Sequence, residues 1–152
     1  MKKSNQKNEL LNDDYIPFNL EIINKKNILD SILILNDGKV FLGRAFGSKK
    51  TNIGEICFNT SMTGYQEIIT DPSYAGQIIT FTFPHIGNVG SNSSDIEGET
   101  NSISGIIVRQ HPTAPSNWRS ENSFNDWLIR NDIPGISGID TRMLTKTIRN
   151  SK

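Results

Sequence analysis

Cysteine is almost absent from this 152-residue chain, which has one thiol, at Cys57. One cysteine excludes an intramolecular disulfide framework and is typical of a protein in a reducing compartment. Histidine is nearly as scarce, and His85 and His111 lie far apart in the sequence. One thiol and two distant imidazoles lack the ligand spacing of a zinc site. We therefore expect no metal site, and we predict that Cys57, inside a strand-like pattern, is a buried and inert thiol.

Net charge is also missing, because 16 Lys and Arg residues balance 16 Asp and Glu residues. A neutral chain has no net field to attract nucleic acid or an anionic membrane. The longest clean apolar run, residues 32–35, is far too short to span a bilayer, and no secretory signal pattern opens the chain. A phosphate-binding GxxxxGK[ST] loop is absent as well. These absences predict a cytoplasmic protein that binds neither nucleic acid nor membrane.

Apolar residues are scarce too, at 35% of the chain, and part of the deficit lies at its start. Residues 1–31 are rich in Asn, Lys and Asp, which predicts a poorly ordered N-terminal extension. Residues 32–152 have the length of one ordinary domain with a single hydrophobic core.

Strand patterns dominate the first part of this domain. Residues 32–35 and 39–42 are apolar runs on either side of Asp37-Gly38, which predicts a β-hairpin with a primed turn. Three further strands are predicted, at residues 55–59, 77–83 and 103–109. The last of these contains three consecutive β-branched residues and is expected to be central and buried.

Helical spacing appears only in the last third of the chain. Apolar residues at i, i+3 and i+4 after Ser123 predict a helix that ends near Asn131. Residues 133–136 are interpreted as a turn that leads into an extended piece through residue 139. Strands first and helices late predict an α+β or layered β/β/α domain.

A second helix is predicted over residues 141–150, with Asp140 as its N-cap. Its apolar stripe consists of Met143, Leu144, Thr147 and Ile148. We expect this helix to pack on the sheet and to bury Leu144 and Ile148.

Two polar, Gly-rich connections, residues 59–73 and 84–98, separate the strands. Long connections of this composition are either functional loops or plain surface loops with turn chemistry, and the residues leave both readings open. Glu67 and Asp71 are spaced i, i+4, but Gly64 and Pro72 argue against a continuous helix between them.

Ser73 and His85 are the individual residues of interest in these connections. Ser73 follows an Asp-Pro pair, so it either bonds its own turn or presents a hydroxyl and an amide to a small polar ligand. His85 follows Pro84, and we expect it to form a hydrogen bond within its loop.

Long motifs follow one another along the chain in a fixed order. They are residues 35–38 (LNDG), 41–44 (FLGR), 58–68 (FNTSMTGYQEI), 70–74 (TDPSY), 83–90 (FPHIGNVG), 105–109 (GIIVR), 116–119 (SNWR) and 138–142 (GIDTR). These motifs resemble the N-terminal domain of the small, glutamine-handling subunit of carbamoyl phosphate synthetase. The resemblance covers about residues 32–149.

The resemblance implies an α/β fold, the layered β/β/α "swivelling" domain of that subunit. It implies three partners: a C-terminal glutaminase domain, a large synthetase subunit that forms the heterodimer, and glutamine. In the family the glutaminase releases ammonia, and the large subunit uses ATP and divalent metal to make carbamoyl phosphate for arginine and pyrimidines. The resemblance implies no cofactor in this chain. We also expect that the family's next strand lies outside this chain, which would leave an exposed sheet edge.

One functional residue carries over from the family. Ser73 matches the serine of the TDPSY motif that contacts bound glutamine. Cys57 does not match the glutaminase nucleophile, which belongs to the other domain, so no catalytic residue is expected here and the chain alone is predicted to be inactive. Two other readings stay open: a stand-alone binding module that keeps the fold, and a non-functional fragment.

Overall fold

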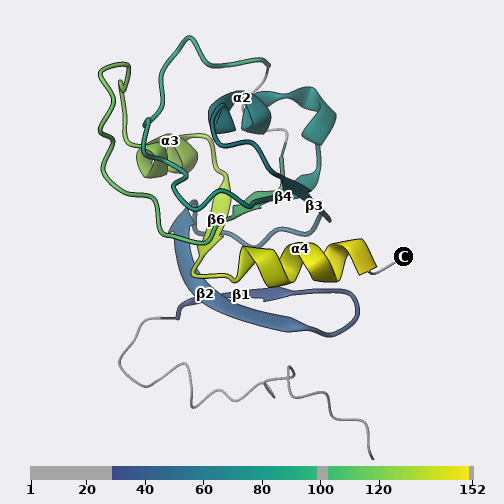
Figure 1. The fold of residues 1–152 in the computed structure, drawn as a ribbon. Coiled ribbons are helices and arrows are strands. Elements are labelled where there is room, and N and C mark those ends of the chain that lie inside the picture. The colour runs from purple at the N-terminus through teal and green to yellow at the C-terminus, as the bar shows by residue number, and fades with distance from the viewer. Residues whose placement is uncertain (1–28, 99–102, 151–152) are drawn as a thin grey trace, which may run out of the picture.

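The computed structural model describes residues 29–98 and 103–150 as a mixed α/β domain with a curled sheet (Figure 1). The strands that it contains are β1 (Ser31–Ile34), β2 (Val40–Gly47), β3 (Glu55–Asn59), β4 (Gln77–Phe81), β5 (Gly105–Ile107) and β6 (Pro134–Ser137). The helices are α2 (Tyr65–Thr70), α3 (Phe124–Arg130) and α4 (Thr141–Asn150), with a short 3-10 turn, η1 (Pro72–Tyr74). The prediction for residues 1–31 falls mostly outside the described residues, although Ser31 already pairs with Gly43 in the sheet.

The strands lie in the order β1-β2-β6-β5-β4-β3. The first three are antiparallel neighbours, and β6, β5, β4 and β3 are parallel. Parallel neighbours require a crossover connection, and α2 with η1 joins β3 to β4 while α3 joins β5 to β6. The expectation that strands come first and helices late is therefore wrong, because a helix lies between β3 and β4.

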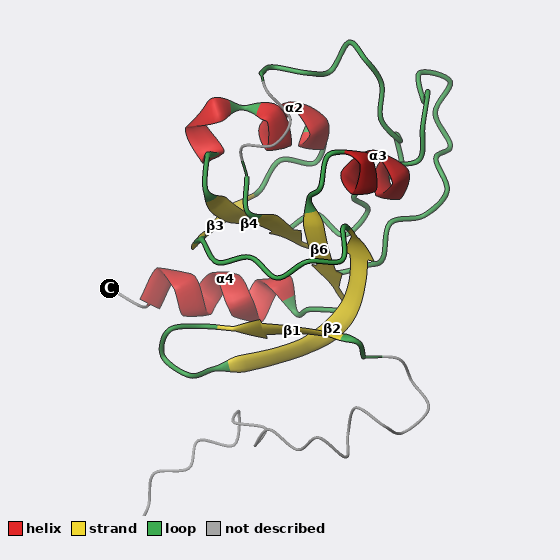
Figure 2. Ribbon diagram, turned by 180° about the vertical axis from the view of Figure 1, so that it is seen from behind, coloured by secondary structure: helices red, strands yellow, loops and turns green. Residues whose placement is uncertain are grey.

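The central parallel strands β4 and β5 are covered on both faces. Successive residues point to opposite faces of a strand, so Ile79 and Ile106 pack with α2 and α3 whereas Ile107 packs with Leu144 of α4. Figure 2 shows α4 between the β1–β2 hairpin and the β3–β4 end of the sheet. Burial on both faces explains the continuous apolar run of β5 and confirms its prediction as a central, buried strand.

The predicted hairpin is present, but its turn differs from the prediction. The Leu35 N–H donates to the Lys39 carbonyl at 2.9 Å, and the Gly38 N–H donates to the Leu35 carbonyl at 3.0 Å. Gly38 has a positive φ of 86°, whereas Asp37 does not. The loop thus spans three residues rather than the two of a primed turn. In addition, β2 continues to Gly47, five residues past its predicted end, because this second half pairs with β6.

Residues 133–136 were predicted to be a turn, but Pro134–Ser137 form strand β6. Proline is tolerated as the first residue of a strand. Gly135 is required by packing, since a Cβ there would lie 2.5 Å from the Phe46 ring. Pro134 therefore marks the start of a strand, and Gly135 marks a close approach of the Phe46 ring to the backbone. Neither residue marks a reversal of the chain.

The two C-terminal helices are confirmed with one change. The Ser123 hydroxyl caps α3 by accepting the Asp126 N–H at 3.1 Å. The Asp140 carboxylate caps α4 by accepting the Met143 N–H at 3.0 Å. Leu144 is fully buried and Ile148 is partly buried against the same cluster, as predicted. Met143, which was placed in the apolar stripe, is instead exposed.

Candidate functional site

The first polar connection contains a short helix that the sequence analysis did not predict. Helix α2 occupies the six residues Tyr65–Thr70 between Gly64, with φ of 77°, and an extended Asp71. Glycine adopts this left-handed conformation without steric cost, so Gly64 directs the chain into the helix rather than interrupting it. Asp71 lies beyond the last turn, and it therefore shares no helical face with Glu67.

A buried polar ladder joins α2 to the second connection. The Gln66 Nε2 donates to the Asn92 carbonyl at 2.6 Å, and the Gln66 Oε1 accepts the Asn92 N–H at 3.0 Å. Both residues are buried. Next to them the Tyr65 hydroxyl donates to the Gly90 carbonyl at 2.6 Å. Burial raises the pKa of Tyr65, which keeps this hydroxyl protonated as a donor. The two connections are thus one structural unit.

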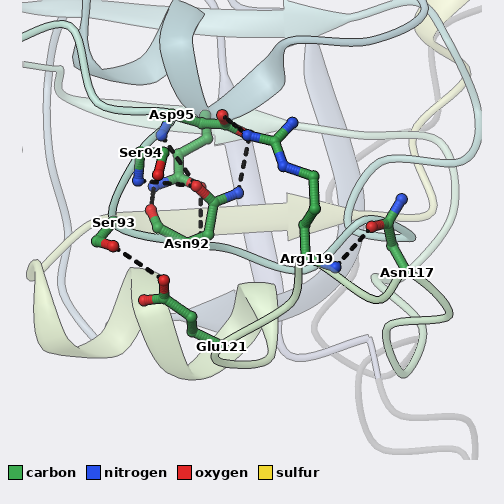
Figure 3. Close-up of polar contacts among 8 residues, drawn as sticks. Asn92, Ser93, Ser94, Asp95, Asn117, Arg119 and Glu121 are labelled. Atoms are coloured by element: carbon green, nitrogen blue, oxygen red, sulfur yellow. Dashed lines mark hydrogen bonds and ion pairs between the residues drawn. The ribbon is translucent and has the colours of Figure 1, made fainter.

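A third segment joins this unit through Asp95 (Figure 3). The Asn92 Oδ1 accepts the N–H groups of Ser94 and Asp95, at 2.9 and 3.0 Å, and its Nδ2 donates to the Asp95 carboxylate at 2.8 Å. From the SNWR motif, the Arg119 Nη2 donates to the other oxygen of Asp95 at 2.6 Å. Both oxygens of the Asp95 carboxylate are therefore occupied.

These three segments enclose a pocket of about 310 Å³ at the N-terminal end of α2. We name it the α2 pocket. It is lined by Thr63, Gly64, Tyr65, Gln66, Glu67, Val89, Gly90, Asp95, Asn117 and Arg119. The sequence singled out both connections and the SNWR motif separately, but nothing in their spacing places them around one cavity.

Ser73 lies away from this pocket, beyond the opposite end of α2. It is exposed within η1, in the turn that the sequence predicted. Its N–H donates to the Asp71 Oδ1 at 2.8 Å, and its hydroxyl also bonds this carboxylate. These two hydrogen bonds lower the pKa of Asp71. The turn therefore presents Ser73 at the surface while Asp71 holds its amide.

The remaining candidate residues do not converge. His85 is exposed, with its ring edge against Phe83 at 5.7 Å between centroids, and no hydrogen bond of its side chain appears among the described residues. His111 Nδ1 lies 3.3 Å from the Ser137 hydroxyl. Across residues 29–98 and 103–150, no three His, Cys, Asp or Glu side chains come together in a way that could hold a metal ion.

A larger cavity of about 560 Å³ lies where the β1–β2 hairpin meets the parallel strands. Its walls include Ile78, Ile107 and Ile136, which belong to the core around α4. Polar groups in its lining are bonded to one another, as in the hydrogen bond of 2.7 Å that the Asn52 Nδ2 donates to the Ser104 carbonyl. This cavity presents no convergent set of polar groups for catalysis.

Cys57 on the edge strand β3 is half-buried rather than fully buried. Burial first, and the nearby Glu55 carboxylate second, raise the pKa of the thiol. Since the thiolate is the reactive form, we expect iodoacetamide to modify Cys57 more slowly at pH 7–8 than the same thiol in the urea-unfolded chain. Rates measured by mass spectrometry from pH 7 to 10 test this, and a rate in the folded chain that equals or exceeds the unfolded rate at neutral pH would contradict it.

Comparison with known proteins places these features in a family. Residues 33–152 match the family model described as "Carbamoyl-phosphate synthase small chain, CPSase domain". The chain belongs to this family. It is 57% identical over 118 residues to the carbamoyl phosphate synthase small chain of Listeria innocua, covering 78% of this chain and 32% of that protein. The family match confirms the resemblance that the motifs indicated.

Two further relatives that the chain matches are also carbamoyl phosphate synthase small chains. Over 117 residues in each case, the chain is 54% identical to the carbamoyl phosphate synthase small chain of Zymomonas mobilis and 56% identical to the pyrimidine-specific small chain of Halalkalibacterium halodurans. These alignments cover 77% of this chain and 31% or 32% of the relatives. The chain thus spans about a third of the length of the curated relatives it matches. None of the helices that the structure describes has the length and apolarity needed to cross a membrane.

Proposed function

We propose that this chain acts as the N-terminal domain of the small subunit of glutamine-dependent carbamoyl phosphate synthetase. In this role it supports the glutaminase domain, docks the large ATP-dependent subunit and contributes one contact to glutamine. The observation that carries the proposal is the family match over residues 33–152. The large subunit, with its ATP and divalent metal, would make the carbamoyl phosphate in the cytoplasm, for arginine or for pyrimidines.

The arrangement of the domain supports this role. Helix α4 covers one face of the curled sheet and α2 with α3 the other (Figure 2), which is compatible with a layered swivelling domain. Ser73 is exposed in its turn, with Asp71 and η1 fixing the backbone beneath it. An exposed hydroxyl can rotate from Asp71 to a ligand without breaking the turn, because the amide remains bonded to the carboxylate. Ser73 can therefore meet the amino-acid end of glutamine from the surface of this domain.

In a complex rebuilt with the glutaminase domain and the large subunit, we expect Ser73→Ala to lower kcat/KM for glutamine a few-fold. The loss of one neutral hydrogen bond is worth about 0.5–1.5 kcal/mol. Ammonia-dependent synthesis should stay nearly unchanged, because ammonia bypasses the glutamine pocket. Rates with the two nitrogen sources, measured side by side on the same preparation, test the role of Ser73.

Ser61→Ala is the matched control. Ser61 is also exposed, and its N–H also bonds a side chain two residues earlier, the Asn59 Oδ1 at 2.8 Å. This variant should leave both rates at the wild-type level. If Ser73→Ala instead lowered both rates equally and lowered the melting temperature, Ser73 would only stabilise its own turn and would not contact glutamine.

A further inference from the structure

Two large, exposed apolar side chains belong to residues that adjoin lining residues of the α2 pocket in the sequence, and we call these two residues its rim. Trp118 is 92% exposed, and it lies between the lining residues Asn117 and Arg119. Met62 is 69% exposed and directly precedes the lining residue Thr63. Tryptophan and methionine are enriched at protein–protein contacts and are depleted from surfaces that face only water. Their position beside one pocket marks this surface as an interface.

The lining of the pocket carries an excess of negative charge. Arg119 is neutralised by Asp95, since their side chains lie 2.6 Å apart. Glu67 is partly exposed, and its carboxylate pairs with no cation among the described residues. The pocket therefore presents one uncompensated carboxylate beneath an apolar rim. The chemistry that complements it is a cation on an aliphatic stem, because the stem can pack on Met62 and Trp118 while the cation meets Glu67.

The floor of this surface is already ordered before any partner binds. Asp95 holds the Arg119 side chain, and the turn of the loop holds Asn117, whose Oδ1 accepts the Arg119 N–H at 2.9 Å (Figure 3). The Gln66–Asn92 ladder fixes Gln66, which also lines the pocket. A preorganised surface loses little conformational entropy on association, so the exposed side chains can contribute most of their contact energy.

We propose that the α2 pocket, with Trp118 and Met62 at its rim, is a docking site for a protein surface that presents a Lys or Arg side chain flanked by apolar side chains. A small molecule inside the pocket would leave Trp118 in water, because Trp118 does not line the cavity. Only a larger body covers both the cavity and the rim. A protein partner is therefore the occupant that fits.

The partner is the large synthetase subunit, an assignment that rests on the proposed function. In the proposed function, Ser73 faces the glutaminase domain. Ser73 lies beyond the C-terminal end of α2, whereas the pocket lies at the N-terminal end of this helix. Helix α2 has six residues, a length of about 9 Å at the helical rise, and Ser73 lies three residues beyond its last residue, Thr70. The two ends of α2 thus serve two different partners.

Binding of the 152-residue chain to the purified large subunit, measured by titration calorimetry, tests this inference. We expect Trp118→Ala to raise Kd roughly tenfold or more, as for an exposed aromatic side chain that the partner buries on binding. Because Trp118 touches little of its own chain, the melting temperature should not change. Ile53→Ala is the matched control, since Ile53 is 94% exposed but does not line the pocket, and it should bind like the wild type.

The charge requirement is tested separately. Glu67→Gln should raise Kd roughly two- to fivefold at low salt, the range of a single partly exposed ion pair. It should also weaken the salt dependence of binding, because the ion pair is the part that salt screens. Glu55→Gln, which removes an exposed carboxylate from β3, should change neither Kd nor its salt dependence.

A spectroscopic signal completes the design. Trp127 is buried, so the long-wavelength fluorescence of the chain comes from Trp118 and should shift to shorter wavelength when the large subunit binds. The wild-type chain can bind the large subunit while the Kd values of Trp118→Ala and Ile53→Ala differ by less than twofold and the fluorescence does not shift. That result overturns the inference and leaves the proposed function intact. No binding of the wild-type chain to the large subunit overturns the docking role in the proposed function, and this partner assignment fails with it.

Discussion

Gly47→Ala is expected to lower the free energy of unfolding by about 2–5 kcal/mol, the sum of two separate costs. Gly47 has φ of 69°, a conformation that costs a residue with a side chain about 1–2 kcal/mol. An added Cβ would also lie 2.4 Å from the Ile133 carbonyl oxygen and 3.2 Å from the Leu128 Cβ. A backbone oxygen cannot swing aside as a side chain can, so β2 and β6 must shift, at about 1–3 kcal/mol for overpacking.

Gly76→Ala separates the two costs. Gly76 has nearly the same backbone angle, with φ of 73°, but a Cβ there would meet nothing within 4 Å. It should therefore lose only the conformational term of about 1–2 kcal/mol. Urea unfolding of both variants, followed by circular dichroism, gives the comparison. Equal losses at the two positions would show that the approach of Ile133 to Gly47 does not constrain the fold.

Glycine illustrates how far the sequence alone predicts this fold. The Asp37-Gly38 pair predicted a hairpin because turn chemistry is local, and the hairpin is confirmed. Gly135 was misread as part of a turn, since nothing nearby in the sequence indicates that Phe46 packs on its backbone. Close approach between residues 89 positions apart is a tertiary property. Strands with continuous β-branched runs, by contrast, were predicted correctly, because their burial shows in composition.

Helix α2 was missed for a related reason. Gly64 and Pro72 looked like interruptions, whereas they flank a helix of six residues. A helix this short is unstable by itself, and its stability comes from tertiary packing of Tyr65 and Ile69 in the core. A signal was nevertheless present, because these two apolar residues are spaced i, i+4, as on one helical face.

The candidate site also has one part that the sequence predicts and one part that depends on tertiary contacts. Ser73 was identified because its motif resembles a known family, and the structure places it in the predicted turn. The α2 pocket could not be predicted, because its lining comes from three separate segments: residues 63–67, then Val89, Gly90 and Asp95, and finally Asn117 and Arg119. The contacts that join these segments are made by side chains, to the backbone in the Gln66–Asn92 ladder and to another side chain in the Arg119–Asp95 pair. Such contacts leave no periodic pattern in one sequence.

Gln66→Leu is the second substitution with a large expected effect. Leucine nearly preserves the buried volume, but it removes both hydrogen bonds to the Asn92 backbone, at 2.6 and 3.0 Å. Asn92 is only 6% exposed, so its N–H and carbonyl would be left without partners in a buried place. Each unsatisfied group costs about 1–3 kcal/mol, and for the two groups we expect a total loss of about 2–6 kcal/mol from the free energy of unfolding.

Gln77→Leu is the control for this substitution, because Gln77 is partly exposed and its side chain makes no hydrogen bond among the described residues. It should change stability by less than about 0.5 kcal/mol. Hydrogen exchange adds a local measurement: the Asn92 amide should exchange much faster in Gln66→Leu than in the wild type, as the loop opens more often. Unchanged exchange at Asn92 together with unchanged stability would contradict the ladder.

Gln66→Leu also distinguishes residues that hold the α2 pocket in shape from residues that contact the partner. Gln66 lines one wall of the cavity and holds the second connection in place, so Gln66→Leu should reduce both stability and binding to the large subunit. Trp118, by contrast, contributes only its exposed side chain, and its removal should reduce binding alone. If Gln66→Leu lowered stability but left binding intact, the pocket wall would not need to be preorganised, and Trp118 and Met62 would carry the contact without it.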